Sequence, residues 1–365
     1  MTRKYAPILL VMAALAWPPA GEATVKVVTT IQDYAAIARD IGRDRVEVAA
    51  IVAGNSDAHF VKPKPSYAIM LRDADLFVST GLDLELWAPV LVNKAGNRQI
   101  VDGASGYVSA SQGLELMEKP ASMDRSAGDV HVYGNPHITT SPLNMAVVAR
   151  NITTGLCKVD PEGCDAYTLR LKDFNDRLAR RLYGDRLPEL LGVEALDPLA
   201  RNGRLVPFLE EHDLLDELGG WLGQAMSIRG QKLVCYHKNW IYFTTLFGLT
   251  VVDFVEPKPG IPPTARHVAE LVQRIDNEDI RVLLTANYFE RRKPELIAER
   301  TGIMPVVVPM YVGGEEGVED YFDLVDLWIG RLTRAFAAAP DHHHPEDHEH
   351  GAHDQRNGHH RSGRR

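Results

Sequence analysis

The chain has 365 residues, of which 45% are hydrophobic and 24% are charged, and its formal net charge is −9. This composition is typical of a globular protein with a substantial buried core, and the length suits two domains better than one. The acidic balance argues against a nucleic-acid partner and is compatible with the capture of cations.

The amino terminus has the organisation of a secretory signal peptide. Arg3 and Lys4 precede an apolar run over residues 6–17, which small residues follow. We predict cleavage after Ala23 and therefore an exported protein. The apolar run is too short for a membrane anchor, and the predicted cleavage point has no cysteine nearby to carry a lipid. No other apolar run is long enough to cross a bilayer, so no membrane insertion is predicted.

Strands and helices alternate through the next part of the chain. Residue types and periodicity predict strands at residues 24–30, 45–52, 75–80 and 99–101, and helices at 32–41, from Ser66 to 72, and from 86 onward. Ser66 is the predicted N-cap of its helix. Strands that alternate with helices indicate a parallel sheet covered on both faces, so an α/β lobe is predicted.

A second α/β lobe is predicted towards the carboxyl terminus. A polar surface loop at 113–135 and a helix headed by Ser141 and Pro142 come first, and a long, mostly exposed helix follows at 166–191. Gly184 and Pro188 are candidates for a kink or an early end of that helix. Further strands are predicted at 232–236, 250–254, 281–285 and 305–308, and helices at 240–246, from Thr264 to 275, at 294–300 and at 321–336.

The predicted organisation thus has five parts. They are a signal peptide at 1–23, an N-terminal lobe at 24–164, a linker helix at 165–192, a C-terminal lobe at 193–338 and a disordered histidine-rich tail at 339–365.

Three cysteines are present. Cys157 and Cys164 are close enough in sequence to form a small disulfide in an oxidising compartment, but the sequence leaves the bonded and free states equally open. Cys235, within an apolar strand, is predicted to be a buried thiol.

The tail differs from the rest of the chain. Residues 341–365 hold eight of the 14 histidines, interleaved with acidic residues. Such a segment cannot form an apolar core, so disorder is predicted. Collection of divalent metal ions is the favoured role, and a purification tag or a solubilising tail is the alternative.

Three histidines stand on stiffened turns and are predicted to bind metal. His137 ends the sequence Gly134-Asn135-Pro136-His137, in which proline and glycine constrain the backbone, while His59 and His237 follow predicted strands. Neutral imidazoles suit Zn²⁺, whereas Mn²⁺ prefers more oxygen ligands. A catalytic zinc in a hydrolase is the alternative, but no His-Glu-x-x-His motif and no glutamate evidently beside a ligand supports it.

Several motifs, taken in order, resemble one protein family. They are Asp57-Ala58-His59 with Pro63-Lys64-Pro65-Ser66, then Gly134-Asn135-Pro136-His137, Tyr236-His237, and Glu256-Pro257-Lys258-Pro259-Gly260. Over residues 24–335 the chain resembles the zinc/manganese solute-binding proteins of bacterial ABC uptake transporters (cluster A-I, zinc-type). The resemblance implies two four-stranded α/β lobes joined by a long rigid helix. It also implies a monomeric periplasmic protein that hands metal to a permease and is no enzyme.

The same resemblance implies the ligands. His59 and His137 match the ligands from the first lobe, and His237 matches the ligand from the second lobe, where manganese proteins often carry glutamate. Relatives often place an aspartate late in the second lobe, but residues 306–314 hold no carboxylate. Water, His131, Asp57, Glu315 and Glu316 remain alternatives for a fourth ligand. A manganese-specific binding protein remains the alternative function, alongside the exported zinc hydrolase.

Overall fold

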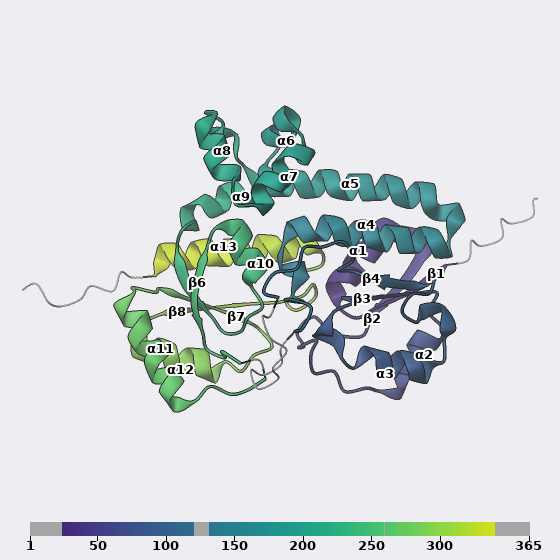
Figure 1. Cartoon of the computed structure of the whole chain (residues 1–365), viewed down its shortest axis with the longest axis horizontal. Coiled ribbons are helices and arrows are strands. Elements are labelled where there is room, and N and C mark those ends of the chain that lie inside the picture. Colours follow the sequence, from purple (N-terminus) through teal and green to yellow (C-terminus); the bar gives the residue numbers. More distant parts are fainter. Residues whose placement is uncertain (1–23, 120–130, 259, 340–365) are drawn as a thin grey trace, which may run out of the picture.

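The computed structural model describes residues 24–119, 131–258 and 260–339. The predicted signal peptide and the histidine-rich segment from residue 341 lie outside these ranges. Two sheets of four parallel strands lie side by side, each with helices on both faces (Figure 1). The predicted fold class, two parallel four-stranded sheets flanked by helices, is therefore confirmed.

The first lobe is built on the strand order β2-β1-β3-β4. Its strands are rich in β-branched residues, and β1 and β3 are almost wholly buried, as expected of strands covered on both faces. Helices α1 and α4 cover one face and α2 and α3 cover the other (Figure 1). The elements are β1 (Val25–Thr29), α1 (Gln32–Gly42), β2 (Val46–Ala50), α2 (Pro65–Arg72), β3 (Leu76–Ser79), α3 (Ala88–Ala95), β4 (Tyr107–Ser109) and α4 (Pro142–Val159).

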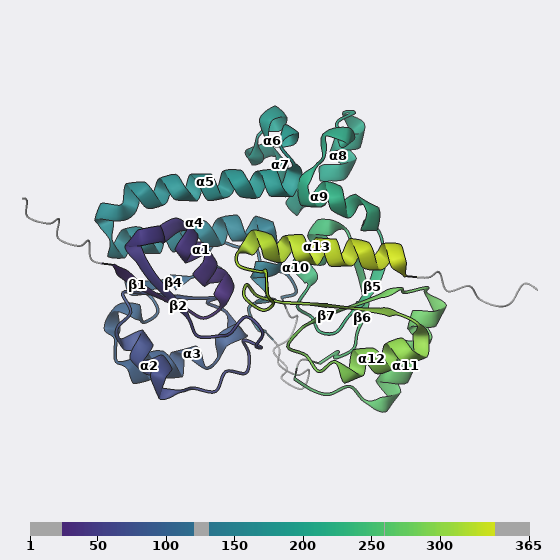
Figure 2. The same cartoon turned by 180° about the vertical axis from the view of Figure 1, so that it is seen from behind.

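The second lobe repeats the order of the first as β6-β5-β7-β8. Helix α13 covers one face, and α11 and α12 cover the other (Figure 2). The predicted cap of α11 is present, because the Thr264 hydroxyl accepts a hydrogen bond from the His267 backbone N–H at 3.1 Å. The elements are β5 (Lys232–Cys235), α10 (Ile241–Phe247), β6 (Thr250–Phe254), α11 (Ala265–Asn277), β7 (Val282–Ala286), α12 (Arg292–Thr301), β8 (Met304–Val308) and α13 (Tyr321–Ala338).

A helical segment connects the lobes. Helix α5 (Cys164–Tyr183) contacts α1 and α4 of the first lobe, and contacts α9 at its far end (Figure 1). It ends before Gly184, which has a φ of 83° and whose backbone passes so close to Gly219 that an added Cβ would lie 2.8 Å from the Gly219 Cα. The helix predicted over 166–191 is therefore divided. Four short helices follow: α6 (Arg186–Leu191), α7 (Val193–Arg201), α8 (Leu205–Glu211) and α9 (Gly220–Ala225).

The two lobes share a core and several hydrogen bonds. One cluster of buried apolar side chains contains residues of both sheets. The Val312 backbone N–H donates to Asp33 Oδ1 at 2.8 Å, and the Tyr321 hydroxyl donates to the Thr139 carbonyl at 2.8 Å. These contacts fix the lobes relative to one another.

Two local predictions in the first lobe are wrong. The fourth strand is Tyr107–Ser109, whereas residues 99 and 100 of the strand predicted at 99–101 lie in a short 3₁₀ helix, Arg98–Ile100, which the Asn97 side chain caps. Helix α2 begins at Pro65 with Lys64 as its N-cap, so Ser66 lies inside the helix. Proline suits the first helical position, because that backbone nitrogen has no partner within the helix.

Two of the three cysteines are bonded to each other. Cys157 and Cys164 form a disulfide, and Cys235 is the buried thiol predicted from its strand. Among the described residues, no helix combines the length and the apolar character needed to cross a membrane.

Candidate metal centre

Four imidazoles converge where the two lobes meet. The ring centroids of His59 lie 5.2 Å from those of His131 and of His137, and 6.2 Å from that of His237. The centroids of His137 and His237 are 5.9 Å apart. Ligand atoms of His59, His131 and His137 all lie within 4.8 Å of one another. The structure thus brings the three predicted ligands together and adds a fourth imidazole.

His59 is oriented by contacts on both sides. It follows β2, and the Trp87 indole N–H donates to the carbonyl of the preceding residue, Ala58, at 2.7 Å. Asp57 Oδ1 lies 2.9 Å from the His59 backbone nitrogen and 2.8 Å from its ring Nδ1. The carboxylate therefore holds the outer nitrogen of the ring, and Nε2 is directed to the other imidazoles.

His137 is positioned by the residue two places before it. Asn135 Oδ1 accepts a hydrogen bond from the His137 backbone N–H at 3.0 Å. Asn135 is itself tied to both lobes: its backbone N–H donates to the Met117 carbonyl at 2.8 Å, and its side chain donates to the Lys238 carbonyl at 2.6 Å. The Tyr242 hydroxyl donates to the Asn135 carbonyl at 2.7 Å. The rigid mount inferred from proline and glycine is thus also an anchor to the second lobe.

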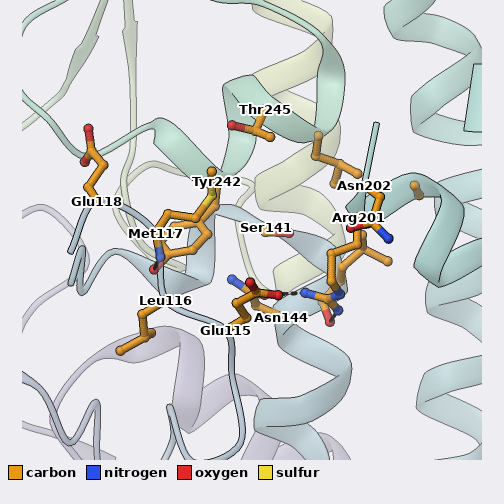
Figure 3. A pocket seen from close by; sticks show the side chains of 13 residues that line it. Glu115, Leu116, Met117, Glu118, Ser141, Asn144, Arg201, Asn202, Tyr242 and Thr245 are labelled. Atoms are coloured by element: carbon orange, nitrogen blue, oxygen red, sulfur yellow. Dashed lines mark hydrogen bonds between the residues drawn. The ribbon is translucent and has the colours of Figure 1, made fainter. Parts of the chain in front are cut away.

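A cavity of about 330 Å³ lies behind this anchor (Figure 3). The segment 115–118, the start of α4, the end of α7 and helix α10 line it, and Arg201 reaches across it to donate to Asn144 Oδ1 at 3.2 Å. None of its lining residues is a histidine, so the cavity is separate from the imidazole cluster.

His237 follows β5 and has a carboxylate beside it. Its Nδ1 lies 3.5 Å from Glu256 Oε1, an ion-pair distance rather than a hydrogen bond. Glu256 is held by its backbone N–H, which donates to the Tyr236 carbonyl, and by the Gly260 N–H, which donates to Oε1, both at 2.8 Å. Glu256 therefore lies beside His237, a contact that the sequence motifs did not predict.

Burial lowers the pKa of two histidines of the cluster, His131 and His137. Desolvation, together with the charges of His59 and His237, lowers the pKa of His131 to about 3, and desolvation lowers the pKa of His137 well below its usual value. Burial would raise the pKa of Asp57, but its contacts with His59 hold that pKa below its usual range. Burial would also raise the pKa of Glu256, but its contacts with His237 and with the Gly260 N–H together hold that pKa below its usual range. Neutral imidazoles backed by carboxylates are the form that binds metal.

Several buried ring nitrogens have no hydrogen-bond partner among the described residues. Nδ1 of His131, Nε2 of His137 and Nδ1 of His237 make no hydrogen bond within the described part of the chain. Buried polar atoms are rarely left in this state. Since Nδ1 of His237 faces Glu256, Nε2 of His137 is the atom of this set that best fits a cation held among the imidazoles.

The other predicted alternatives lie elsewhere or play another part. Asp57 contacts the outer nitrogen of His59, Glu315 pairs with Arg331, and Glu316 is exposed. His131 is six residues before His137, and only its proximity to that motif pointed to it in the sequence.

Comparisons with known proteins identify the family and the fold that this chain resembles. A family model described as the zinc-uptake complex component A, periplasmic, matches residues 27–181 and 211–335. The high-affinity zinc uptake system protein ZnuA of Bacillus subtilis is 22% identical over 277 residues, which are 75% of this chain and 73% of that protein. The manganese ABC transporter substrate-binding lipoprotein PsaA of Streptococcus mitis is 26% identical over 322 residues, which are 86% and 89% of the two chains. A zinc-bound deletion mutant of ZnuA superimposes with a TM-score of 0.64 at 22% identity, covering 87% of this chain and all of that one.

Proposed function

The chain belongs to the family of periplasmic zinc-uptake components, metal-binding solute-binding proteins of ABC transporters, and on this premise we propose that it captures Zn²⁺ between its lobes. The ion is then handed to a membrane permease. The chain is a binding protein and not an enzyme, in keeping with its relatives. We propose that it works in the periplasm as a monomer.

We choose zinc over manganese because the side chains of the cluster offer nitrogen atoms as ligands. We propose that His59 and His137 bind the ion from the first lobe and His237 binds it from the second. The carboxylates of Asp57 and Glu256 contact the outer nitrogens of His59 and His237. Such partners orient the rings and leave nitrogen as the donor. A nitrogen-rich site favours Zn²⁺, whereas Mn²⁺ favours oxygen ligands, so the zinc-type relatives are the better guide than the manganese-type ones.

The same contacts support capture rather than hydrolysis. A zinc hydrolase needs a carboxylate or another base beside the metal-bound water. Asp57 is engaged by the backbone and the ring of His59, and Glu256 is held by Gly260 and faces Nδ1 of His237. Both carboxylates are thereby committed to positioning ligands.

Competition titration with a chromophoric chelator tests this function. Metal-free protein should bind one Zn²⁺ tightly and prefer it to Mn²⁺. His137→Ala should weaken zinc binding by at least about 100-fold, since even the partners behind ligands contribute about 10–100-fold. Exposed His212, bonded to the Phe208 carbonyl at the end of α8, provides the control His212→Ala, which should bind as the wild type does. A preference for Mn²⁺, or an unchanged affinity in His137→Ala, contradicts the proposal.

The histidine-rich tail is proposed to collect metal weakly. Deletion of residues 341–365 should lower the number of weakly bound ions and preserve the tight site. Loss of the tight site on deletion would instead make the tail a source of ligands.

A further inference from the structure

We propose that His131 is the fourth metal ligand, so that four imidazoles and no carboxylate hold the ion. The inference rests on the proposed zinc-binding function and deepens it. It fills the position that the sequence motifs leave open, and it gives the site a physical basis for selecting zinc.

The spacing of the ring nitrogens fits a tetrahedral zinc site. The Nε2 atoms of His59 and His131 are 3.3 Å apart. With Zn–N bonds of about 2.0–2.1 Å, two ligand nitrogens of a tetrahedron are about 3.3–3.4 Å apart. The two imidazoles are therefore already placed along one edge of such a tetrahedron. Ligand atoms of His137 and of these two residues lie within 4.8 Å of one another, so small side-chain movements would complete the face.

The backbone around His131 is held by specific contacts. The His131 carbonyl accepts a hydrogen bond from the Gly134 N–H at 3.1 Å, which closes a turn, and the Val132 N–H donates to Asp83 Oδ2 at 3.2 Å. Gly134 has a φ of 120°, and an added Cβ there would lie 2.9 Å from the Leu116 Cβ. Only glycine fits this close approach. The turn presents His131 to the cluster from the side of the first lobe.

His131 differs from His59 and His237 in the partner of its outer ring nitrogen. His59 has Asp57 and His237 has Glu256, whereas Nδ1 of His131 is buried and has no hydrogen-bond partner among the described residues. Zinc bound at Nε2 leaves the imidazole proton on Nδ1, so the neutral ring binds without a net change in its protonation. All four proposed ligand atoms are then nitrogens, which disfavours Mn²⁺.

Zinc X-ray absorption of the full chain, loaded with one equivalent of Zn²⁺, tests this assignment by counting imidazoles. The wild type should show four. His131→Ala should show three imidazoles and an oxygen, with zinc affinity lower by at least about 10-fold and a smaller preference for zinc over Mn²⁺. His131→Gln, which keeps most of the side-chain volume, should lose the same imidazole signal. His212→Ala should retain four.

Two results separate this inference from the proposed function. If His131→Ala leaves the spectrum and the affinity unchanged while His137→Ala abolishes tight binding, the function stands and the fourth ligand is not His131. If neither substitution changes zinc binding, the cluster is not the site and both proposals fail. Three imidazoles in the wild type also overturn the proposal of a four-imidazole site.

Discussion

Asp33 is a buried carboxyl group at the seam between the lobes, and we predict that it makes stability depend on pH. It lies in the first turn of α1 with no exposed surface. Its Oδ1 accepts the Val312 N–H from the second lobe, while Oδ2 has no partner in the described part of the chain. Burial raises the pKa of Asp33 to about 7, against a smaller lowering by the bonds from Val312 and Thr139.

The sign and size of the effect follow from this shift. The folded protein binds the Asp33 proton more tightly than the unfolded chain, whose value is 3.8. The stability contributed by the protonated group is therefore fully present below about pH 4 and is lost as pH rises through about 7. Each pKa unit corresponds to about 1.4 kcal/mol, so the full effect is on the order of 4 kcal/mol, of which about 2.5 kcal/mol falls between pH 5 and pH 8.

Asp33→Asn isolates this effect, because the amide keeps an acceptor for Val312 but does not titrate. The new N–H₂ group needs a buried acceptor, at a cost of about 1–3 kcal/mol that does not change with pH. The informative quantity is therefore the difference in unfolding free energy between variant and wild type, measured with urea on metal-free protein at pH 5 and pH 8. We expect it to shift by about 2.5 kcal/mol in favour of the variant at pH 8. Asp44→Asn, at an exposed carboxylate, is the control and should show no such shift. Equal differences at both pH values would refute the reasoning.

Three further predictions follow from contacts around the cluster and in the first lobe. Asp57→Asn and Glu256→Gln should each lower zinc affinity by about 10-fold or more in chelator competition, because the imidazoles lose the carboxylates behind them; an unchanged affinity would mean that the rings are held by other contacts. Tyr242→Phe removes two hydrogen bonds of the hydroxyl to the first lobe, at 2.7 and 3.2 Å, and should lower the unfolding free energy in urea by about 1–3 kcal/mol; no loss would show that water replaces them. Replacing Cys157 and Cys164 by alanine opens a loop with a sequence separation of 7 and should lower the unfolding free energy by about 2 kcal/mol without changing zinc affinity. A lower zinc affinity would show that the disulfide also supports the metal site.

The regular elements of this fold were readable from the sequence where local signals were strong. Seven of the eight strands were predicted near their positions, because β-branched runs lie between turn residues. The strand at Tyr107–Ser109 is only three residues long and carries too little pattern. The short helices between residues 193 and 225 were not predicted, since each is stabilised by packing rather than by a long amphipathic period.

The sequence predicted only part of the site, because some of its contacts depend on how the strands pair. The rigid turns around His59, His137 and His237 are local features, and the sequence identified all three. The contact between His237 and Glu256 depends on the register of β5 with β6, which shifts at a bulge between Leu233 and Val234 before Cys235 pairs with Phe254. No local pattern predicts such a shift.

The position of His131 depends on contacts that are distant in sequence. Asn135 bonds to Lys238, 103 residues away, and accepts from Tyr242, 107 residues away. These bonds set the path of the segment that carries both His131 and His137, so the approach of His131 to the cluster could be seen only in the folded chain.

The two lobes share a strand order but place different side chains at equivalent positions. His59 follows β2, and Glu256 follows β6, which occupies the equivalent place in the second sheet. At matching positions, one lobe therefore supplies an imidazole and the other a carboxylate that supports His237. Three of the four imidazoles come from the first lobe, and the apolar core runs through both lobes. Wide separation of the lobes would expose that core, whereas movement of the segment carrying His131 and His137 would break hydrogen bonds such as those of Asn135 to Lys238 and Tyr242 and that of Val132 to Asp83. We therefore expect metal release to proceed through this segment rather than through opening of the whole molecule.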